Sequence, residues 1–276
     1  MNLNVSIIQS NLHWENVDQN LTMFSEKIDA LAERTDIIVL PEMFNTGFSM
    51  ESEKLAETME GKTVAWMKKQ AKKSGAVITG SLIIEVDASP LEGRLRGMNY
   101  YNRLIWAQPD GEVLTYDKRH LFRMAGEHNY FNAGEKRLIV AYKGWKICPL
   151  ICYDLRFPVW ARNSPLTTQG SSPVYDILIY IANWPAVRQQ PWSKLLEARA
   201  IENQCYVIGL NRVGEDANGI SYSGNSVVVN PKGEIVSTIL ENEDSSETVN
   251  LSLDELNDFR EKFPVSLDGD EFEITP

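Results

Sequence analysis

Long hydrophobic runs and cysteines are scarce in this chain of 276 residues. Its longest strongly apolar stretch, at about residues 177–182, is far shorter than the roughly 18 apolar residues of a membrane-spanning helix, so we expect no membrane insertion. No Lys or Arg precedes the first apolar residues, which indicates a strand rather than a signal peptide. The three cysteines, Cys148, Cys152 and Cys205, are too few for a disulfide framework, and a cytoplasmic location is predicted.

Basic residues and histidines are also few. There are 27 Lys and Arg against 38 Asp and Glu, so the formal net charge is −11. Nucleic-acid binding relies on an excess of Lys and Arg, and we expect no such partner, although a local basic pocket for a small anion stays open. The three histidines, His13, His120 and His128, have no ligand spacing relative to cysteines or acids, so no metal ion is predicted. Because no Gly-x-Gly-x-x-Gly follows a strand, a parallel Rossmann sheet fits less well. No cofactor is expected.

The rest of the sequence alternates between strand and helix patterns. Helical spacing of apolar residues marks three segments, at 16–34, 64–73 and 192–203. Short apolar runs mark strands at 4–9, 36–40, 76–85, 139–142, 145–151, 175–181 and 205–210.

Two turn signals add hairpins to this alternation. The turn at 108–111 predicts one antiparallel pair, and the turn at 230–233 predicts a second between 226–229 and 234–239. No linker separates the elements into independent parts. The pattern therefore indicates one layered α/β domain, with sheets packed face to face and helices outside.

Three of the predicted strands run into a residue with useful chemistry. These residues are Glu42, Lys118 and Cys152. The end of a strand holds a side chain in a fixed direction while its tip reaches a cleft. Cys152 also enters a sharp turn whose backbone N–H groups can bind an oxyanion, which is typical of a nucleophile. Taken singly, Glu42 could cap a turn, Lys118 could be a solvated loop charge and Cys152 could be a core thiol. The occurrence of all three at strand ends favours an active site.

The sequence around these residues resembles the nitrilase, or carbon–nitrogen hydrolase, superfamily. The matching motifs each carry one member of its Glu-Lys-Cys triad, and they are PE at 41–42, YDKRHLF at 116–122 and ICYDLRFP at 151–158. Shorter matches follow at 182–185, 198–204 and 211–214, so the resemblance runs from about residue 3 to about residue 264. It implies a four-layer αββα sandwich of two mixed sheets face to face with helices outside.

The same resemblance predicts the organisation of the chain. Residues 1–240 form the hydrolase domain, and residues 241–276 form an extension that packs on it or on the partner of a homodimer. The main departure from the superfamily pattern is the segment 164–173, rich in Ser, Thr and Pro, which is longer than its counterpart and is expected to be a surface loop. This departure affects local loop geometry and leaves the triad in place.

The fuller strings at 41–48, 117–124 and 260–264 are similar to those of bacterial omega-amidases. That similarity implies a small-molecule amide substrate, 2-oxoglutaramate or 2-oxosuccinamate, which is hydrolysed at its terminal amide. By the same correspondence Cys152 attacks the carbonyl, and Glu42 moves the thiol proton to the leaving nitrogen. Lys118 and the backbone N–H of Tyr153 bind the oxyanion, and Glu127 holds Lys118 and helps to position the substrate or water.

The carboxylate of such a substrate needs a local cation in this acidic chain. Arg188 is the first candidate and Arg123 the second, although either could form a surface ion pair instead. Trp184, Phe44 and Tyr130 are candidates for the walls of the pocket, unless they belong to the core.

A third arginine, Arg156, lies in the turn after the cysteine. We expect it to brace that turn by pairing with Asp154 or Glu202.

Other interpretations remain open at this point. Within the superfamily, the chain could be a different amidase, an N-carbamoyl hydrolase or a nitrilase that acts on another small substrate. A thiol transferase or redox protein could use Cys148 and Cys152, but their spacing differs from Cys-x-x-Cys and no His is placed as a base. A catalytically inactive binding module is disfavoured by the intact Glu, Lys and Cys.

Overall fold

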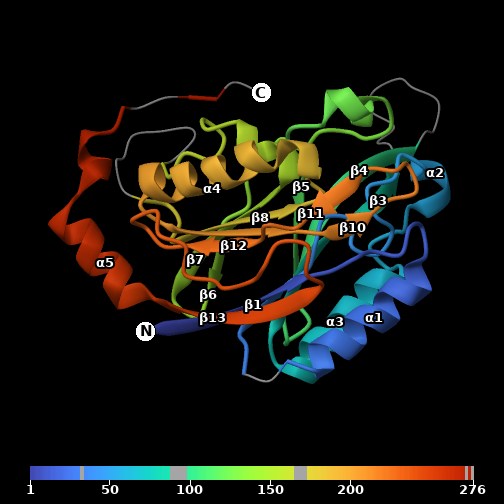
Figure 1. Ribbon diagram of the computed structural model, residues 1–276, viewed down its shortest axis with the longest axis horizontal. Helices are drawn as coiled ribbons and strands as arrows, with labels where there is room; N and C mark the ends of the chain where they lie inside the picture. Colours follow the sequence, from blue (N-terminus) through green and yellow to red (C-terminus); the bar gives the residue numbers. More distant parts are fainter. Residues whose placement is uncertain (32–33, 88–97, 165–172, 271–272, 275–276) are drawn as a thin grey trace.

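Two β-sheets lie face to face between helices in the computed structural model (Figure 1). The structure describes residues 1–31, 34–87, 98–164, 173–270 and 273–274, so most of the loop predicted at 164–173 lies outside the described residues. The layers follow the order helix, sheet, sheet, helix. This arrangement confirms the predicted αββα sandwich.

The first sheet contains six strands in the order β13-β1-β2-β3-β4-β5. Strands β1 to β3 are parallel, β4 and β5 continue the sheet as antiparallel strands, and β13 pairs antiparallel with β1 at the opposite edge. The hairpin predicted around residues 108–111 is therefore confirmed. The strands are β1 (Asn2–Gln9), β2 (Ile37–Val39), β3 (Val77–Asp87), β4 (Met98–Ala107), β5 (Val113–Asp117) and β13 (Ser245–Ser252).

The second sheet contains five strands in the order β12-β9-β8-β7-β6. Its three central strands are parallel. They consist largely of apolar residues, as is typical of strands that are buried on both faces. The strands are β6 (Val140–Tyr142), β7 (Trp145–Ile151), β8 (Ile177–Ala182), β9 (Tyr206–Asn211) and β12 (Val227–Val229). Beside them, β10 (Val213–Glu215) and β11 (Ser221–Ser223) form a separate two-stranded ribbon.

Three helices cover the outer faces of the two sheets. Helices α1 (Val17–Asp29) and α3 (Lys62–Ser74) lie against the first sheet, and α4 (Gln189–Asn203) lies against the second (Figure 1). They correspond to the three segments predicted from helical spacing. The shorter helices are α2 (Ser52–Leu55), α5 (Leu253–Lys262) and the 3₁₀ turns η2 (Arg123–Ala125), η3 (Glu127–Asn129), η4 (Cys152–Arg156), η5 (Ala186–Arg188) and η6 (Val265–Asp268). In the described part of the chain, no helix has the length and apolar character needed to span a bilayer.

The side chains of residues 37–40 point alternately to the two faces of the first sheet, and a separate core lies on each face. Ile37 and Val39 belong to the core shared with the second sheet, whereas Ile38 and Leu40 belong to the core shared with α1 and α3. All four side chains are fully buried. Successive side chains of a strand point to opposite faces, so both faces of this strand are apolar and the polar Glu42 comes only after its end.

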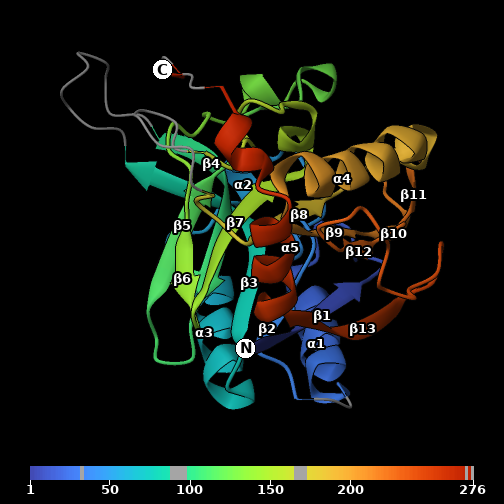
Figure 2. The same ribbon diagram turned by 90° about the vertical axis from the view of Figure 1, so that its left-hand side faces the viewer.

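The C-terminal segment extends the first sheet and covers one side of the sandwich. Strand β13 pairs with β1 over its whole length, and α5 crosses the flank of the two sheets (Figure 2). From α5, Arg260 donates to Asp176 Oδ1 at 2.7 Å, and Leu256 is fully buried in the core between the sheets. Residues 245–262 therefore pack on the body of the same chain, and contact with a dimer partner stays a prediction.

The second predicted hairpin is confirmed only next to its turn. Val229 and Ile235 form an antiparallel bridge, flanked by backbone bonds from Asn230 to Glu234 and from Val236 to Val228, both at 2.8 Å, but residues 234–239 form no strand. Thr238 and Ile239 donate their backbone N–H groups to the Glu247 carboxylate, at 2.8 and 2.9 Å, instead of to a neighbouring strand. A side-chain carboxylate that binds successive backbone N–H groups replaces the strand ladder at this point.

Candidate active site

Cys152 stands where β7 ends and the turn η4 begins. Its φ of +44° lies in the left-handed region, which a residue other than glycine adopts when surrounding contacts enforce it. The buried Asp154 carboxylate accepts from the backbone N–H of Ile151 and of His120, both at 3.0 Å, and from the Tyr116 hydroxyl at 2.8 Å. These bonds fix the turn, which therefore presents the cysteine in one direction at the end of a buried strand.

Lys118 brings two glutamates together in the interior. Its ammonium nitrogen lies 2.8 Å from Glu42 Oε1 and 3.0 and 2.9 Å from the two carboxylate oxygens of Glu127. Glu42 comes shortly after β2 and Lys118 directly after β5, so the ends of two strands in one sheet supply this pair. All three side chains are fully buried. The contact between Glu127 and Lys118 that the superfamily resemblance implies is therefore present.

Two asparagines for which the sequence analysis predicted no role complete the polar cluster, although one of them, Asn183, lies in the motif at 182–185. Asn102 on β4 donates to Glu42 at 2.8 Å and to Glu127 at 3.3 Å. Asn183, which follows β8, donates its backbone N–H to Glu42 Oε2 at 2.8 Å and accepts from Cys152 Sγ at 3.9 Å through its carbonyl oxygen. The backbone of Asn183 thus contacts both Cys152 and Glu42. A polar amide inside or directly after an apolar strand is the signal that marks both residues, because a buried amide needs partners.

The charges of this cluster act on one another at short range. Burial, and after it the charge of Glu42, raises the pKa of the Cys152 thiol well above its usual range, and Lys118 opposes the rise. Burial alone lowers the pKa of Lys118, but Glu127 and Glu42 outweigh it and raise that pKa. Burial and the Glu42 charge raise the pKa of Glu127 against the opposing Lys118. The resting cysteine is therefore a neutral thiol beside a permanently charged ammonium.

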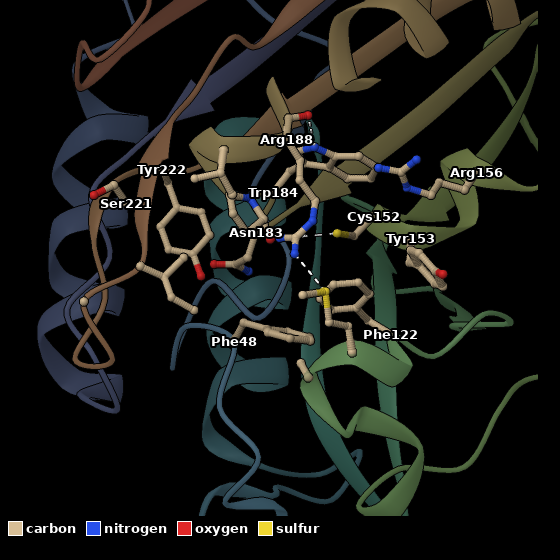
Figure 3. A pocket seen from close by; sticks show the side chains of 16 residues that line it. Phe48, Phe122, Cys152, Tyr153, Arg156, Asn183, Trp184, Arg188, Ser221 and Tyr222 are labelled. Atoms are coloured by element: carbon tan, nitrogen blue, oxygen red, sulfur yellow. Dashed lines mark hydrogen bonds between the residues drawn. The ribbon is translucent and has the colours of Figure 1, made fainter. Parts of the chain in front are cut away.

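A cavity of about 470 Å³ opens over Cys152 (Figure 3). Among the described residues, no Asp or Glu lines it, whereas two arginines do, in a chain whose net charge is −11. The cavity is therefore suited to a small anion. Its wall is formed by Phe48, Phe122, Met124, Ala125, Cys152, Tyr153, Arg156, Asn183, Trp184, Pro185, Val187, Arg188, Gly219, Ile220, Ser221 and Tyr222.

Two of the predicted substrate-binding residues, Arg188 and Trp184, lie in this wall. The Arg188 guanidinium donates to Met124 Sδ at 2.8 Å and lies 5.5 Å from the centre of the Phe122 ring. The Trp184 indole N–H donates to the backbone carbonyl of Arg188 at 2.7 Å, which ties the two residues together. Figure 3 shows the Arg188 side chain extending into the cavity and the Trp184 ring beside Arg156.

The prediction that Phe44 lines the pocket is wrong. Its fully buried ring packs edge-on against Phe24 at 5.5 Å and lies 5.8 Å from Trp66, in the core between the first sheet and its helices. Met43, between Glu42 and Phe44, has a φ of +44°, and this left-handed residue turns the chain so that its two neighbours enter different layers. Phe48 takes the wall position that was predicted for Phe44.

Tyr130 and Arg123 also lie outside the cavity wall. Both are exposed, and Tyr130 lines a separate surface groove. Gly126, whose φ is +73°, reverses the chain between η2 and η3. The reversal directs Glu127 inwards to Lys118 while Tyr130 and Arg123 point towards solvent.

The predicted pairing of Arg156 is wrong as well. Asp154 is occupied by the turn around Cys152, and Glu202 binds Arg199 at 2.9 Å. Arg156 instead lies with its guanidinium 5.1 Å from the centre of the Trp184 ring and lines the cavity, as Figure 3 shows. Its cation therefore faces the same space as Arg188. In the described ranges, no three His, Cys, Asp or Glu side chains gather closely enough to hold a metal ion.

The fold and the site together define a class of protein. In this four-layer sandwich Cys152, at the end of a strand, opens into a cavity, and the backbone of Asn183 joins it to the buried cluster of Lys118 and two glutamates, an architecture like that of the nitrilase superfamily. The chain belongs to its carbon–nitrogen hydrolase family, which matches residues 4–261. It is therefore a hydrolase of carbon–nitrogen bonds other than peptide bonds.

Individual relatives resemble the chain over nearly its whole length. It is 43% identical over 272 residues to omega-amidase YafV of Escherichia coli (strain K12), with 99% of this chain and 98% of the relative covered. It is 31% identical over 268 residues to 2-oxoglutaramate amidase of Bacillus subtilis (strain 168), with 96% of each covered. The solved structure of XC1258 from Xanthomonas campestris, a CN-hydrolase superfamily protein with an arsenic adduct in its active site, is 40% identical and superposes with a TM-score of 0.91 over 100% of both chains.

Proposed function

We propose that this protein is an omega-amidase, which hydrolyses the terminal amide of 2-oxoglutaramate or 2-oxosuccinamate to the dicarboxylic 2-oxo acid and ammonia. The observation that carries the proposal is that Cys152 opens into a cavity with two arginines and, among the described residues, no acid in its wall. A substrate with an amide at one end and a carboxylate at the other suits such a cavity. The names of two relatives, an omega-amidase and a 2-oxoglutaramate amidase, support the same substrate class.

In the first half of the reaction, Cys152 Sγ attacks the carbonyl carbon of the amide. Because burial and the Glu42 charge raise the pKa of the thiol, attack requires transfer of its proton to Glu42. Lys118 Nζ and the backbone N–H of Tyr153 donate to the oxyanion, and the loss of one such donor raises the barrier by about 3 kcal/mol. Glu42 then gives the proton to the nitrogen, so that ammonia leaves and a thioester remains.

In the second half, water gives a proton to Glu42 and attacks the thioester, and the departing thiolate recovers that proton. Glu42 is fixed for both steps by Lys118 Nζ, Asn102 Nδ2 and the backbone N–H of Asn183, each at 2.8 Å. Glu127 accepts from Lys118 through both oxygens and so orients the ammonium. This network keeps the base in place while its charge changes.

The carboxylate of the substrate is assigned to Arg188, with Arg156 as a second cation on the same wall. The guanidinium of Arg188 is held by a thioether, Met124 Sδ, at 2.8 Å. A thioether is a weak acceptor, and a carboxylate that binds through two oxygens readily replaces it. Trp184 supplies the flat surface between the two arginines.

The enzyme is further proposed to be a cytoplasmic homodimer that needs no cofactor, as the superfamily resemblance implies. Light scattering that gives twice the 31.3 kDa of one chain would support the dimer. Ammonia release that survives exhaustive treatment with a chelator would support independence of a metal.

The test compares ammonia release from 2-oxoglutaramate, glutamine, a nitrile of the same carbon chain and an N-carbamoyl amino acid. We expect kcat/KM for 2-oxoglutaramate to exceed the others by at least about 100-fold, with no turnover by the Cys152→Ala variant. Mass spectrometry after rapid quenching should find the acyl group on Cys152. Turnover of the nitrile or the carbamoyl compound alone would contradict the proposed function, and binding of the amide without an acyl adduct would support an inactive binding module.

A further inference from the structure

Asn183 contacts both reacting side chains through its backbone and leaves its own side chain at the cavity. Its N–H donates to Glu42 Oε2 at 2.8 Å, and its carbonyl accepts from Cys152 Sγ at 3.9 Å. Its side-chain nitrogen Nδ2 donates to the backbone carbonyl of Glu42 at 2.5 Å. That carbonyl is an acceptor only, so it fixes which end of the carboxamide is nitrogen and which is oxygen.

The other end of the carboxamide, Oδ1, has no hydrogen-bond partner in the part of the chain that the structure describes. Asn183 is only 4% exposed, lines the cavity over Cys152, and its Oδ1 receives no hydrogen bond from the described residues. Figure 3 shows the carboxamide beside Tyr222, but the hydroxyl proton of Tyr222 is used in a bond to Asp216 Oδ2 at 2.9 Å. A buried acceptor without a donor is costly, so its retention in a cavity points to a donor that arrives with the ligand.

The substrate carries such a donor at the reacting end. A primary amide has two N–H groups on the nitrogen that becomes ammonia, and this nitrogen must lie near Glu42 to receive its proton. Asn183 is bound to Glu42 on one side and to Cys152 on the other, so its side chain lies on the same part of the wall. We propose that Asn183 Oδ1 accepts a hydrogen bond from the leaving nitrogen and makes the enzyme selective for amides.

This proposal rests on the proposed amidase function and adds one contact to it. When the bond between Cys152 Sγ and the carbonyl carbon has formed, Glu42 transfers its proton to nitrogen and the carbon–nitrogen bond breaks, with its electron pair going to nitrogen. The nitrogen is cationic between these two events, and its N–H bond to Asn183 Oδ1 is then charge-assisted. The contact is therefore stronger in the transition state than in the bound amide, as catalysis requires.

An ester of the same acid lacks this contact. Its leaving oxygen carries no hydrogen, so lone pairs of the ester oxygen and of Asn183 Oδ1 would face each other. Amide and ester nevertheless form the same thioester on Cys152, and their two adducts place an oxyanion on the same donors. The ratio of their kcat/KM values consequently reports on events at the leaving group, because the acyl part and its contacts are the same in both substrates.

The experiment measures kcat/KM for 2-oxoglutaramate and for the 5-methyl ester of 2-oxoglutarate with wild type, Asn183→Ala and Asn183→Asp. We expect Asn183→Ala to lower the amide-to-ester ratio by about 10- to 100-fold. Asn183→Asp keeps an oxygen in the position of Oδ1 and should retain more of that ratio, whatever its effect on the two separate rates. Thermal unfolding and mass spectrometry of the acyl adduct from the ester check that each variant is folded and holds a reactive Cys152.

Equal losses of amide and ester turnover in Asn183→Ala would overturn the proposal, because they would mean that Asn183 only supports Glu42. An unchanged rate for the amide would overturn it as well. A wild-type protein that releases no ammonia from 2-oxoglutaramate would instead refute the proposed function, and the two failures are thereby distinguished.

Discussion

Replacement of Lys118 by Met tests the buried cluster most directly. The change removes a cation but keeps a long, unbranched side chain between Glu42 and Glu127. Because Nζ lies 2.8 Å from Glu42 Oε1 and 3.0 Å from Glu127 Oε1, these two oxygens are at most about 6 Å apart. At an effective dielectric constant of about 20, two full charges at that distance repel by about 3 kcal/mol. Both carboxylates are fully buried, so water cannot relieve the repulsion.

The variant can avoid this repulsion by holding a proton on one carboxyl group. Burial and the Glu42 charge already raise the pKa of Glu127, and the loss of the opposing Lys118 raises it further. A carboxyl group with a raised pKa in the folded state binds its proton more tightly there than in the unfolded chain. The stability that this proton contributes is therefore complete at low pH. It decreases as the pH rises above the pKa of the carboxyl group in the unfolded chain, about 4.3, and stops decreasing once the pH exceeds the pKa of that group in the folded state.

The size of the effect follows from this linkage. Each pH unit in that range removes up to about 1.4 kcal/mol from the free energy of unfolding, for one proton. We expect the cost of Lys118→Met, relative to wild type, to be smallest at low pH and to rise with pH to about 3–5 kcal/mol at pH 8, the usual cost of removing one partner from a buried ion pair.

Urea unfolding from pH 5 to pH 8 measures this difference. The double variant Lys118→Met/Glu127→Gln removes the charge that remained unpaired, so it should be more stable than the single variant at pH 8 and less dependent on pH. Lys54→Met is the matched control, because Lys54 is 67% exposed and its bond to Glu15, at 3.2 Å, is a surface ion pair that contributes less than about 1 kcal/mol. Parallel stability curves for wild type and Lys118→Met, or a double variant no more stable than the single one at pH 8, would refute the reasoning.

Three further changes test the turn, the anion site and the packing. Asp154→Asn weakens the anchor of the nucleophile turn and should lower kcat by at least about 10-fold with little change in KM, measured by initial rates of ammonia release. Arg188→Met and Arg156→Met should each raise KM for a carboxylated amide by about 10-fold or more and leave that for propionamide unchanged; equal effects on both amides would contradict the anion site. Gly209→Ala places Cβ 2.4 Å from Leu196 Cδ1, and urea unfolding should show a loss of about 1–3 kcal/mol, whereas wild-type stability would mean that α4 can move.

The sequence by itself determined the layers of the fold and the positions of the three chemical groups in the chain. Residues 37–40 are apolar on both faces, so the chain had to be covered on both sides there, and the polar Glu42 had to follow the strand. Cys152 stands in the same relation to β7. These inferences succeed because they depend on the period of a strand and on covalent neighbours, which the sequence contains directly.

Only the tertiary structure decided where side chains beyond the strand ends point. Phe44 was predicted in the cavity and lies in the core, because the left-handed Met43 turns the chain between it and Glu42. Arg156 was predicted in an ion pair and faces the cavity, because other residues had already occupied its expected partners. Both outcomes depend on backbone angles and on competition for partners from distant segments, which no local pattern contains.

The role of Asn183 is the extreme case of this dependence. Its contacts join residues 31 and 141 positions away in the chain. A buried polar group takes whatever partners the packed layers bring to it, since leaving it without any is costly. The sequence could therefore place a cysteine, a glutamate and a lysine at the ends of strands, whereas the closing of two sheets against each other decided that one asparagine lies between two of them.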